Sequence, residues 1–168
     1  MRALVIGEGF LGCALIDALS EAGYEAIGTS RDILSSKFYL DLTKPINGFP
    51  SADVVYIVAA QASYRACEGS QDSWMTNADS PVEIARQCQQ APAYREPGAT
   101  FPVFVSSDSI EWMSNAYTRM KSYAELGVLM FGGAVVRPRR FTADNIASLC
   151  HLMIRVGLDR RPGVYRWP

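Results

Sequence analysis

The sequence has few of the residues that build metal centres and disulfide frameworks. Its single histidine, His151, lies among apolar residues, so we interpret it as structural. The cysteines show no CxxC spacing, and we predict no metal site. We expect them to be small buried side chains in a reducing compartment. They are Cys13, Cys67, Cys88 and Cys150.

Long apolar runs and an excess of either charge are also missing. No stretch approaches the roughly 20 apolar residues that cross a bilayer, and the run before the first glycine is too short for a signal peptide. The 16 basic and 17 acidic residues leave no net field that would attract nucleic acid or an anionic membrane. We therefore predict a cytoplasmic globular protein without nucleic-acid or membrane partners.

Apolar periodicity along the 168 residues predicts strands that alternate with helices. Continuous apolar runs such as 53–60 suit strands buried on both faces of a parallel sheet. The pattern predicts one α/β domain, residues 1–168, with a doubly wound parallel sheet (Rossmann fold) and right-handed crossovers. Strands are expected at 3–6, 24–28, 53–60, 102–105, 133–136 and 163–167. Helices are expected at 11–19, 70–90 and 115–126, and a last helix is expected to run from a cap at Thr142 or Asp144 to Val156. A loop is expected at Pro92, Pro97 and Gly98.

A glycine-rich segment, Gly7-Glu-Gly9-Phe10-Leu11-Gly12, follows the first predicted strand and opens the first predicted helix. Gly7 would permit the turn, Gly9 the approach of a pyrophosphate, and Gly12 close packing of helix on sheet. The free N–H groups and the dipole of the helix would face the phosphates. Three glycines can also form a purely structural turn, but the β-α-β context favours a dinucleotide site.

The residues after the second predicted strand bear on the choice of cofactor. A carboxylate there would bind the ribose 2′-hydroxyl of NAD, whereas this chain has Ser30 and Arg31, which suit a 2′-phosphate. We therefore favour NADP over NAD. In the alternative interpretation Arg31 is a solvated loop residue and Asp32 binds the ribose.

Tyr117 and Lys121 are four positions apart, so on a helix they would lie on one face. A nearby ammonium would lower the pKa of the phenol toward the range useful for proton transfer. Ser107 follows a predicted strand, at the edge where open α/β sheets bind ligands, and its hydroxyl would orient a substrate carbonyl. This set predicts hydride chemistry with Tyr117, Lys121 and Ser107 as the catalytic residues.

The same motifs, in the same order, resemble the extended short-chain dehydrogenase/reductase superfamily, near the nucleoside-diphosphate-sugar epimerases, dehydratases and dTDP-4-dehydrorhamnose reductases. The resemblance implies that Tyr117 donates the proton and that Lys121 also binds the nicotinamide ribose. It rests on the glycine turn, Asp41-Leu42, Ala59-Ala60-Gln61, Asn77, Ser106-Ser107-Asp108, Tyr117 with Lys121, and Arg137-Pro138. It further implies that Asp41, Leu42, Ala59, Ala60, Gln61 and Asn77 belong to the cofactor site.

The chain departs from that pattern where the substrate lobe is usually built. Ser107 and Tyr117 are only ten positions apart, and Arg137-Pro138 runs almost directly into the last helix, so we interpret 137–168 as a shortened substrate-side region. A small carbonyl substrate in an open cleft, a pocket completed by a partner chain, and a cofactor site without turnover all remain possible. Asp108 and Glu111 could form an acid–base pair, although we favour loop carboxylates.

Two functions follow from these patterns. The first is an NADP-dependent reductase, or an epimerase or dehydratase, acting on a sugar nucleotide or another small carbonyl compound. The second is a non-catalytic NADP-binding sensor or partner module. The resemblance implies a homodimer formed through helices 70–90 and 115–126. Exposed aromatics could line a pocket or an interface, although core positions are more common; the candidates are Trp112, Tyr123 and Trp167.

Overall fold

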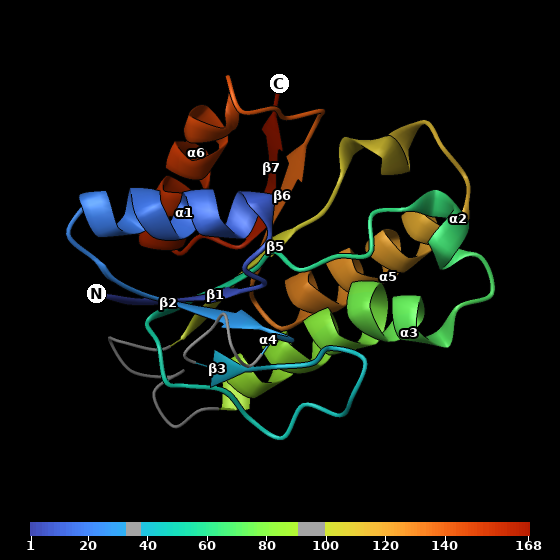
Figure 1. Cartoon of the computed structure of the whole chain (residues 1–168), viewed down its shortest axis with the longest axis horizontal. Helices are drawn as coiled ribbons and strands as arrows, with labels where there is room; N and C mark the ends of the chain where they lie inside the picture. Colours follow the sequence, from blue (N-terminus) through green and yellow to red (C-terminus); the bar gives the residue numbers. More distant parts are fainter. Residues whose placement is uncertain (33–37, 91–99) are drawn as a thin grey trace.

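The computed structural model describes residues 1–32, 38–90 and 100–168, and the loop predicted at Pro92, Pro97 and Gly98 lies outside these residues. Strands and helices alternate along the chain (Figure 1). The elements are β1 (Arg2–Ile6), α1 (Phe10–Glu21), β2 (Glu25–Ser30), β3 (Phe38–Tyr39), β4 (Val54–Ile57), α2 (Tyr64–Cys67), α3 (Gln71–Trp74), the π-helix η1 (Met75–Asp79), α4 (Ser80–Gln90), β5 (Phe101–Val105), the 3₁₀-helix η3 (Asp108–Glu111), α5 (Ala116–Met130), β6 (Ala134–Pro138), α6 (Ile146–Asp159) and β7 (Gly163–Trp167).

The described strands form one parallel sheet with the order β3-β2-β1-β4-β5-β6-β7. The order runs outward in both directions from the neighbouring strands β1 and β4, which pair Ala3 with Val54. This confirms the predicted doubly wound Rossmann fold. Ligands of open parallel sheets bind at such a switch point, outside the carboxyl ends of the strands.

Helices cover both faces of the sheet, with α1 and α6 on one side and α4 and α5 on the other (Figure 1). Neighbouring residues of a strand point to opposite faces, so Val5 packs toward α1 and α6 while Leu4 packs toward α4 and α5. Both side chains are buried, and so is every residue of β4 and β5. This double burial explains why the predicted inner strands are continuous apolar runs.

Several predicted details differ from the structure. The last helix begins at Ile146 and has no side-chain cap, so neither Thr142 nor Asp144 caps it; the N–H of Thr142 instead donates to the side chain of Asn145. Three cysteines are buried as expected, but Cys13 is exposed on the outer face of α1. The short strand β3 was not predicted, because two residues carry no detectable periodicity.

Most of the predicted substrate-side region, residues 137–168, forms α6 and β7, which extend the sheet and its helical layer. Trp167 is buried at the end of β7, whereas Trp112 and Tyr123 are exposed. Within the parts of the chain that the structure describes, no helix combines the length and apolarity needed to span a membrane.

Candidate functional site

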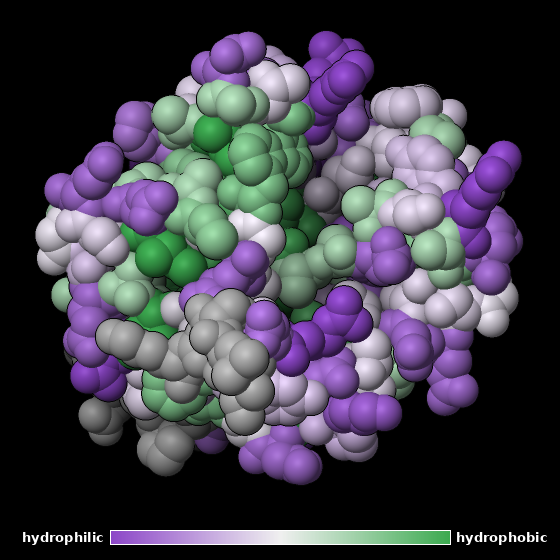
Figure 2. All heavy atoms as spheres, in the orientation of Figure 1, coloured by the Kyte–Doolittle hydropathy of each residue, from purple (hydrophilic) through white to green (hydrophobic). Residues whose placement is uncertain are grey.

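A cavity of about 830 Å³ lies at the carboxyl ends of β1, β2, β4 and β5. The space-filling view shows a hollow in the centre of the molecule, and the residues at the bottom of this hollow are hydrophobic (Figure 2). Thirteen predicted site residues line the cavity: Gly7, Gly9, Phe10, Leu11, Gly12, Ser30, Arg31, Leu42, Ala59, Ala60, Gln61, Tyr117 and Lys121. Three others, Asp41, Asn77 and Ser107, are not among its lining residues.

The glycine turn joins β1 to α1 with no room for side chains at two of its positions. Gly7 has φ 107°, and a Cβ there would lie 2.7 Å from Cβ of Ala59. A Cβ at Gly12 would overlap the carbonyl oxygen of Gly7. Gly9 is different, because its Cβ position has no described atom within 4 Å and faces open space. No side chain caps the first turn of α1, so its N–H groups are available to an anion.

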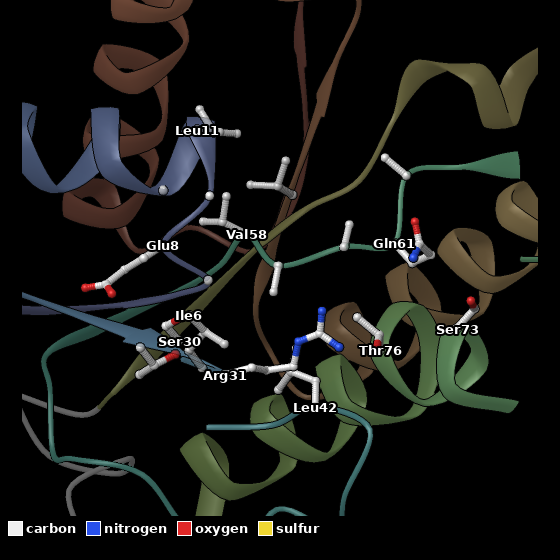
Figure 3. Close-up of a pocket in the computed structure, with 18 of the residues that line it drawn as sticks. Ile6, Glu8, Leu11, Ser30, Arg31, Leu42, Val58, Gln61, Ser73 and Thr76 are labelled. Atoms are coloured by element: carbon white, nitrogen blue, oxygen red, sulfur yellow. The ribbon is translucent and has the colours of Figure 1, made fainter. Parts of the chain in front are cut away.

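The end of β2 forms one wall of the cavity. The carbonyl oxygen of Thr29 accepts hydrogen bonds from the N–H groups of Gly7 and Glu8, each at 3.1 Å, and so ties the glycine turn to this strand. Ser30 and Arg31 follow, and the guanidinium of Arg31 extends toward Leu42 (Figure 3). Ser30 and Arg31, which the sequence analysis proposes as donors to a 2′-phosphate, therefore lie in the wall of the cavity.

Asp41 stabilises the backbone turn next to the cavity. Its carboxylate accepts two hydrogen bonds from Thr43, from the N–H and the hydroxyl, each at 2.9 Å. Burial acts to raise the pKa of Asp41, but these hydrogen bonds and the charges of Arg31 and Lys44 hold it below its usual value. Asp41 thus shapes the turn that places Leu42 in the cavity.

Asn77 is fully buried in the π-helix η1 and holds the loop after β4. Its side-chain oxygen accepts from the N–H of Gln61 at 2.9 Å, and its Nδ2 donates to the Gln61 carbonyl at 3.0 Å. Both backbone groups of Gln61 are therefore bound by one amide. Single π-turns inside helices are frequent at functional sites, and this one points Asn77 at the loop after β4.

Tyr117 and Lys121 enter the cavity from the first two turns of α5. The helix starts with a reciprocal cap in which Asn115 and Thr118 bind each other's backbone N–H groups, which fixes the position of Tyr117. Nζ of Lys121 donates to the Val105 carbonyl at 2.9 Å and lies 5.9 Å from the centroid of the Tyr117 ring. The structure therefore brings the predicted pair together.

The pKa values of this pair are shifted mainly by burial. Burial, with smaller effects from Tyr64 and Cys67, raises the pKa of Tyr117 to about 12, while a hydrogen bond with Ser107 acts in the opposite direction. Burial lowers the pKa of Lys121 to about 7, against the opposing charge of Glu125. The predicted lowering of the phenol pKa by Lys121 is thus not realised in this arrangement, because the amine faces the Val105 carbonyl and the Phe104 ring.

The two serines after β5 have separate environments. Ser107 caps η3, accepts from the N–H of Ser109, and contacts the Ser109 hydroxyl at 2.8 Å. Ser106 lines the cavity, and its buried hydroxyl has no hydrogen-bond partner among the described residues. Sequence reasoning selected only Ser107, although the Ser-Ser pair itself was the signal that could have included Ser106.

Other cavity residues were also missed. Glu8 lies between two recognised glycines, and Thr29 and Phe141 flank predicted motifs, so proximity in sequence could have indicated them. Phe141 stacks on Phe10 with ring centroids 6.3 Å apart, across the mouth of the glycine turn. Polar residues from α3, its N-cap and η1 also line the cavity and carry no sequence signature; they are Ser70, Asp72, Ser73 and Thr76.

Arginines neutralise the carboxylates beside the cavity. Arg137 binds Glu125 with two hydrogen bonds, at 2.9 and 2.6 Å, and reaches Glu111 at 2.7 Å. Glu111 also pairs with Arg166, and Asp108 pairs with Arg139 at 3.3 Å. These pairings favour a structural role for Asp108 and Glu111 over the acid–base alternative.

The buried Lys121 predicts a pH-dependent stability. Its pKa is lowered from 10.5 when unfolded to about 7 when folded, so between these values the unfolded chain binds the extra proton and stability rises with pH. We expect the free energy of unfolding of the wild type to gain about 1.5 kcal/mol relative to Lys121→Met between pH 7 and 8.5. Urea unfolding at the two pH values measures this difference.

The control is Lys44→Met, which removes an exposed lysine and should retain the wild-type pH dependence. Buried thiols have raised pKa values and act in the opposite direction, but they are present in all three proteins and act mainly near pH 9 and above. Equal pH responses of the wild type and Lys121→Met would show that Lys121 does not titrate in this range.

The parallel sheet, the glycine turn and the Tyr117–Lys121 pair in one cavity define a Rossmann-fold protein of the extended short-chain dehydrogenase/reductase type. Residues 3–111 match the NAD dependent epimerase/dehydratase family. The chain belongs to this family. Comparison with curated proteins gave no significant match.

Several solved structures have the same fold as this chain. A dTDP-4-dehydrorhamnose reductase from Bacillus anthracis, in complex with NADP, superposes with a TM-score of 0.74 at 15% identity, over 99% of this chain and 74% of that one. An oxidoreductase of the short-chain dehydrogenase/reductase family from Brucella ovis, with partially ordered NAD, gives 0.73 at 14% identity, over 100% and 99%. A UDP-N-acetylglucosamine 4-epimerase from Bacillus cereus gives 0.70 at 15%, over 99% and 78%.

Proposed function

We propose that this chain is a nicotinamide-dinucleotide-dependent reductase or epimerase that acts on a carbonyl group of a sugar nucleotide or another small substrate. The observation that carries the proposal is the presence of the glycine turn, Tyr117 and Lys121 in one cavity at the switch point of the sheet. The family assignment supports the reaction class. The related structures that contain NAD or NADP support the type of cofactor.

The residues of the cavity fit such a cofactor. The open space at Gly9 leaves room for a pyrophosphate beside the uncapped first turn of α1. Leu42 and the Ala59–Ala60 loop provide apolar walls, and Ser30 with Arg31 provides donors for a 2′-phosphate, which is why NADP is our first choice. Near the other end, Lys121 and the unpartnered Ser106 hydroxyl would face the nicotinamide ribose.

A bound dinucleotide supplies or accepts the hydride of the reaction. In the reducing direction, the Tyr117 hydroxyl would donate the proton that converts the substrate's carbonyl oxygen into the hydroxyl of the alcohol. Ser107 contacts the phenol and would orient the carbonyl oxygen. With its pKa raised to about 12, the Tyr117 phenol is protonated at neutral pH, as donation requires, but the same shift makes it a weaker acid than a free phenol.

A coupled binding and turnover assay tests the proposal. Titration with NADH and with NADPH, followed by nicotinamide fluorescence, should show binding of at least one of them. Incubation of the reduced cofactor with nucleotide sugars and ketones should then give sustained, substrate-dependent loss of nicotinamide absorbance. Absence of binding to both cofactors would contradict the proposal.

A second candidate function is a non-catalytic cofactor-binding module. It is favoured by the short connection between Ser107 and Tyr117, which leaves little chain to enclose a substrate. Binding of cofactor without oxidation of any substrate in the panel would favour this module over the enzyme.

The proposed enzyme is a homodimer. The support is a set of exposed apolar side chains on the outer side of α3 and α5: Trp74, Tyr123, Leu126 and Met130. Trp74 and Tyr123 contact each other with ring centroids 5.6 Å apart, so the two helices share one apolar surface.

A further inference from the structure

Glu8 places a carboxylate against the strand that forms the ribose end of the cavity. A Cβ at Gly28 would overlap Oε1 of Glu8 and would lie 2.6 Å from both Cγ and Cδ, so the acidic side chain lies flat on the backbone of β2. Gly28 and Ser30 are two positions apart and share one face of that strand. Glu8 and Ser30 both line the cavity. The Glu8 carboxylate therefore lies on the same face of β2 as Ser30, two residues before it.

The turn itself holds Glu8 in this place. Its N–H donates to the Thr29 carbonyl at 3.1 Å, which does not depend on the side chain. Within residues 1–32, 38–90 and 100–168, no hydrogen bond or ion pair engages the Glu8 carboxylate. The side chains of Glu8 and Arg31 point in opposite directions (Figure 3). The guanidinium of Arg31 is directed toward Leu42 and Thr76. The negative charge of Glu8 is therefore not neutralised by Arg31.

These observations bear on the difference between the two nicotinamide cofactors. A ribose 2′-hydroxyl can donate a hydrogen bond to a carboxylate, whereas a 2′-phosphate carries a charge of about −1.5 to −2 and is repelled by it. We propose that Glu8 is a cofactor-specificity residue that favours the ribose of NAD and opposes the preference of Arg31 for NADP. Glu8 would therefore reduce the preference for NADP that Arg31 creates. This inference rests on the proposed function.

Binding measurements on matched variants test the role of Glu8. Glu8→Gln retains the size of the side chain and removes its charge, so we expect NADPH to bind about tenfold more tightly and NADH a few-fold more weakly. The gain for NADPH should shrink at high salt, because screening weakens the repulsion in the wild type. Fluorescence titration of the wild type and of Glu8→Gln with NADH and with NADPH, at two salt concentrations, measures these affinities.

Three further variants control the experiment. Glu21→Gln removes an exposed carboxylate at the far end of α1 and should leave both affinities unchanged. Asp32→Asn tests the other acidic candidate for the ribose. Glu8→Ala should shift the ratio of the two affinities in the same direction as Glu8→Gln, and circular dichroism checks that each variant folds.

The outcomes separate this inference from the proposed function. If the wild type binds both cofactors but the ratio of affinities is unchanged in Glu8→Gln, the role of Glu8 is wrong and the proposed function stands. A shifted ratio in Asp32→Asn alone would assign the role to Asp32. If the wild type binds neither cofactor, both proposals fail.

Discussion

Replacing Tyr117 with phenylalanine is expected to lower turnover by about a thousandfold while leaving the affinity for the cofactor within about twofold, because only the proton-donating hydroxyl is lost. The phenylalanine retains the ring that packs against Tyr64, with centroids 5.4 Å apart, so the fold should be preserved. Steady-state kinetics with the substrate identified in the panel measures turnover. Fluorescence titration measures cofactor binding.

A matched control for this variant is available on the same helix. Tyr123→Phe removes a phenol hydroxyl from a residue that is 47% exposed, six positions further along α5 and away from the cavity. It keeps the ring that contacts Trp74 in the proposed dimer surface, so its turnover should equal that of the wild type. Retained turnover in Tyr117→Phe would exclude Tyr117 as the proton donor. Loss of turnover in Tyr123→Phe as well would indicate a general effect on α5.

Substitution of alanine at Gly12 and at Gly9 is expected to have opposite consequences. The new Cβ at Gly12 meets the backbone of Gly7, which cannot move away without breaking the bonds between the turn and Thr29, so Gly12→Ala should destabilise the fold by about 3 kcal/mol. Gly9→Ala meets open space, and its φ of −88° suits alanine, so stability should change little.

The same pair separates folding from cofactor binding. The methyl group of Gly9→Ala would occupy the space into which a pyrophosphate must fit, so we expect its cofactor affinity to fall by at least tenfold in a folded protein. Urea unfolding and fluorescence titration on both variants measure these effects. Unchanged affinity in Gly9→Ala would show that no phosphate approaches the turn at this position.

Much of the architecture was accessible from local patterns. The strands at 3–6 and 102–105 are buried on both faces, and such strands are recognisable as short apolar runs. The first helix and the YxxxK helix follow from apolar spacing and from the motifs that open them. The short strand β3 and the π-turn at Asn77 have no comparable signal, because their backbone geometry depends on pairing with distant parts of the chain.

Most residues predicted for the site line one cavity, and their roles stay predictions. Gly7, Tyr117 and Lys121 belong to motifs with a known spacing, and the structure places them in one cavity. Asn77 does not line the cavity, but its side chain binds the backbone of Gln61, which does. Asp41 likewise lies outside the lining, and its carboxylate accepts a hydrogen bond from the backbone N–H of Thr43. A sequence motif records that a residue is needed, but it does not record whether the side chain faces the cavity or its supporting loop.

The sequence by itself determined the alternation of strands and helices, the glycine turn, and the helical spacing of Tyr117 and Lys121, because each of these depends on residues that are neighbours in the chain. The tertiary structure decided the pKa values of that pair, the separate surroundings of Ser106 and Ser107, and the contact of Glu8 with Gly28. Burial and side-chain pairing arise between segments far apart in the chain, so only the folded arrangement specifies them.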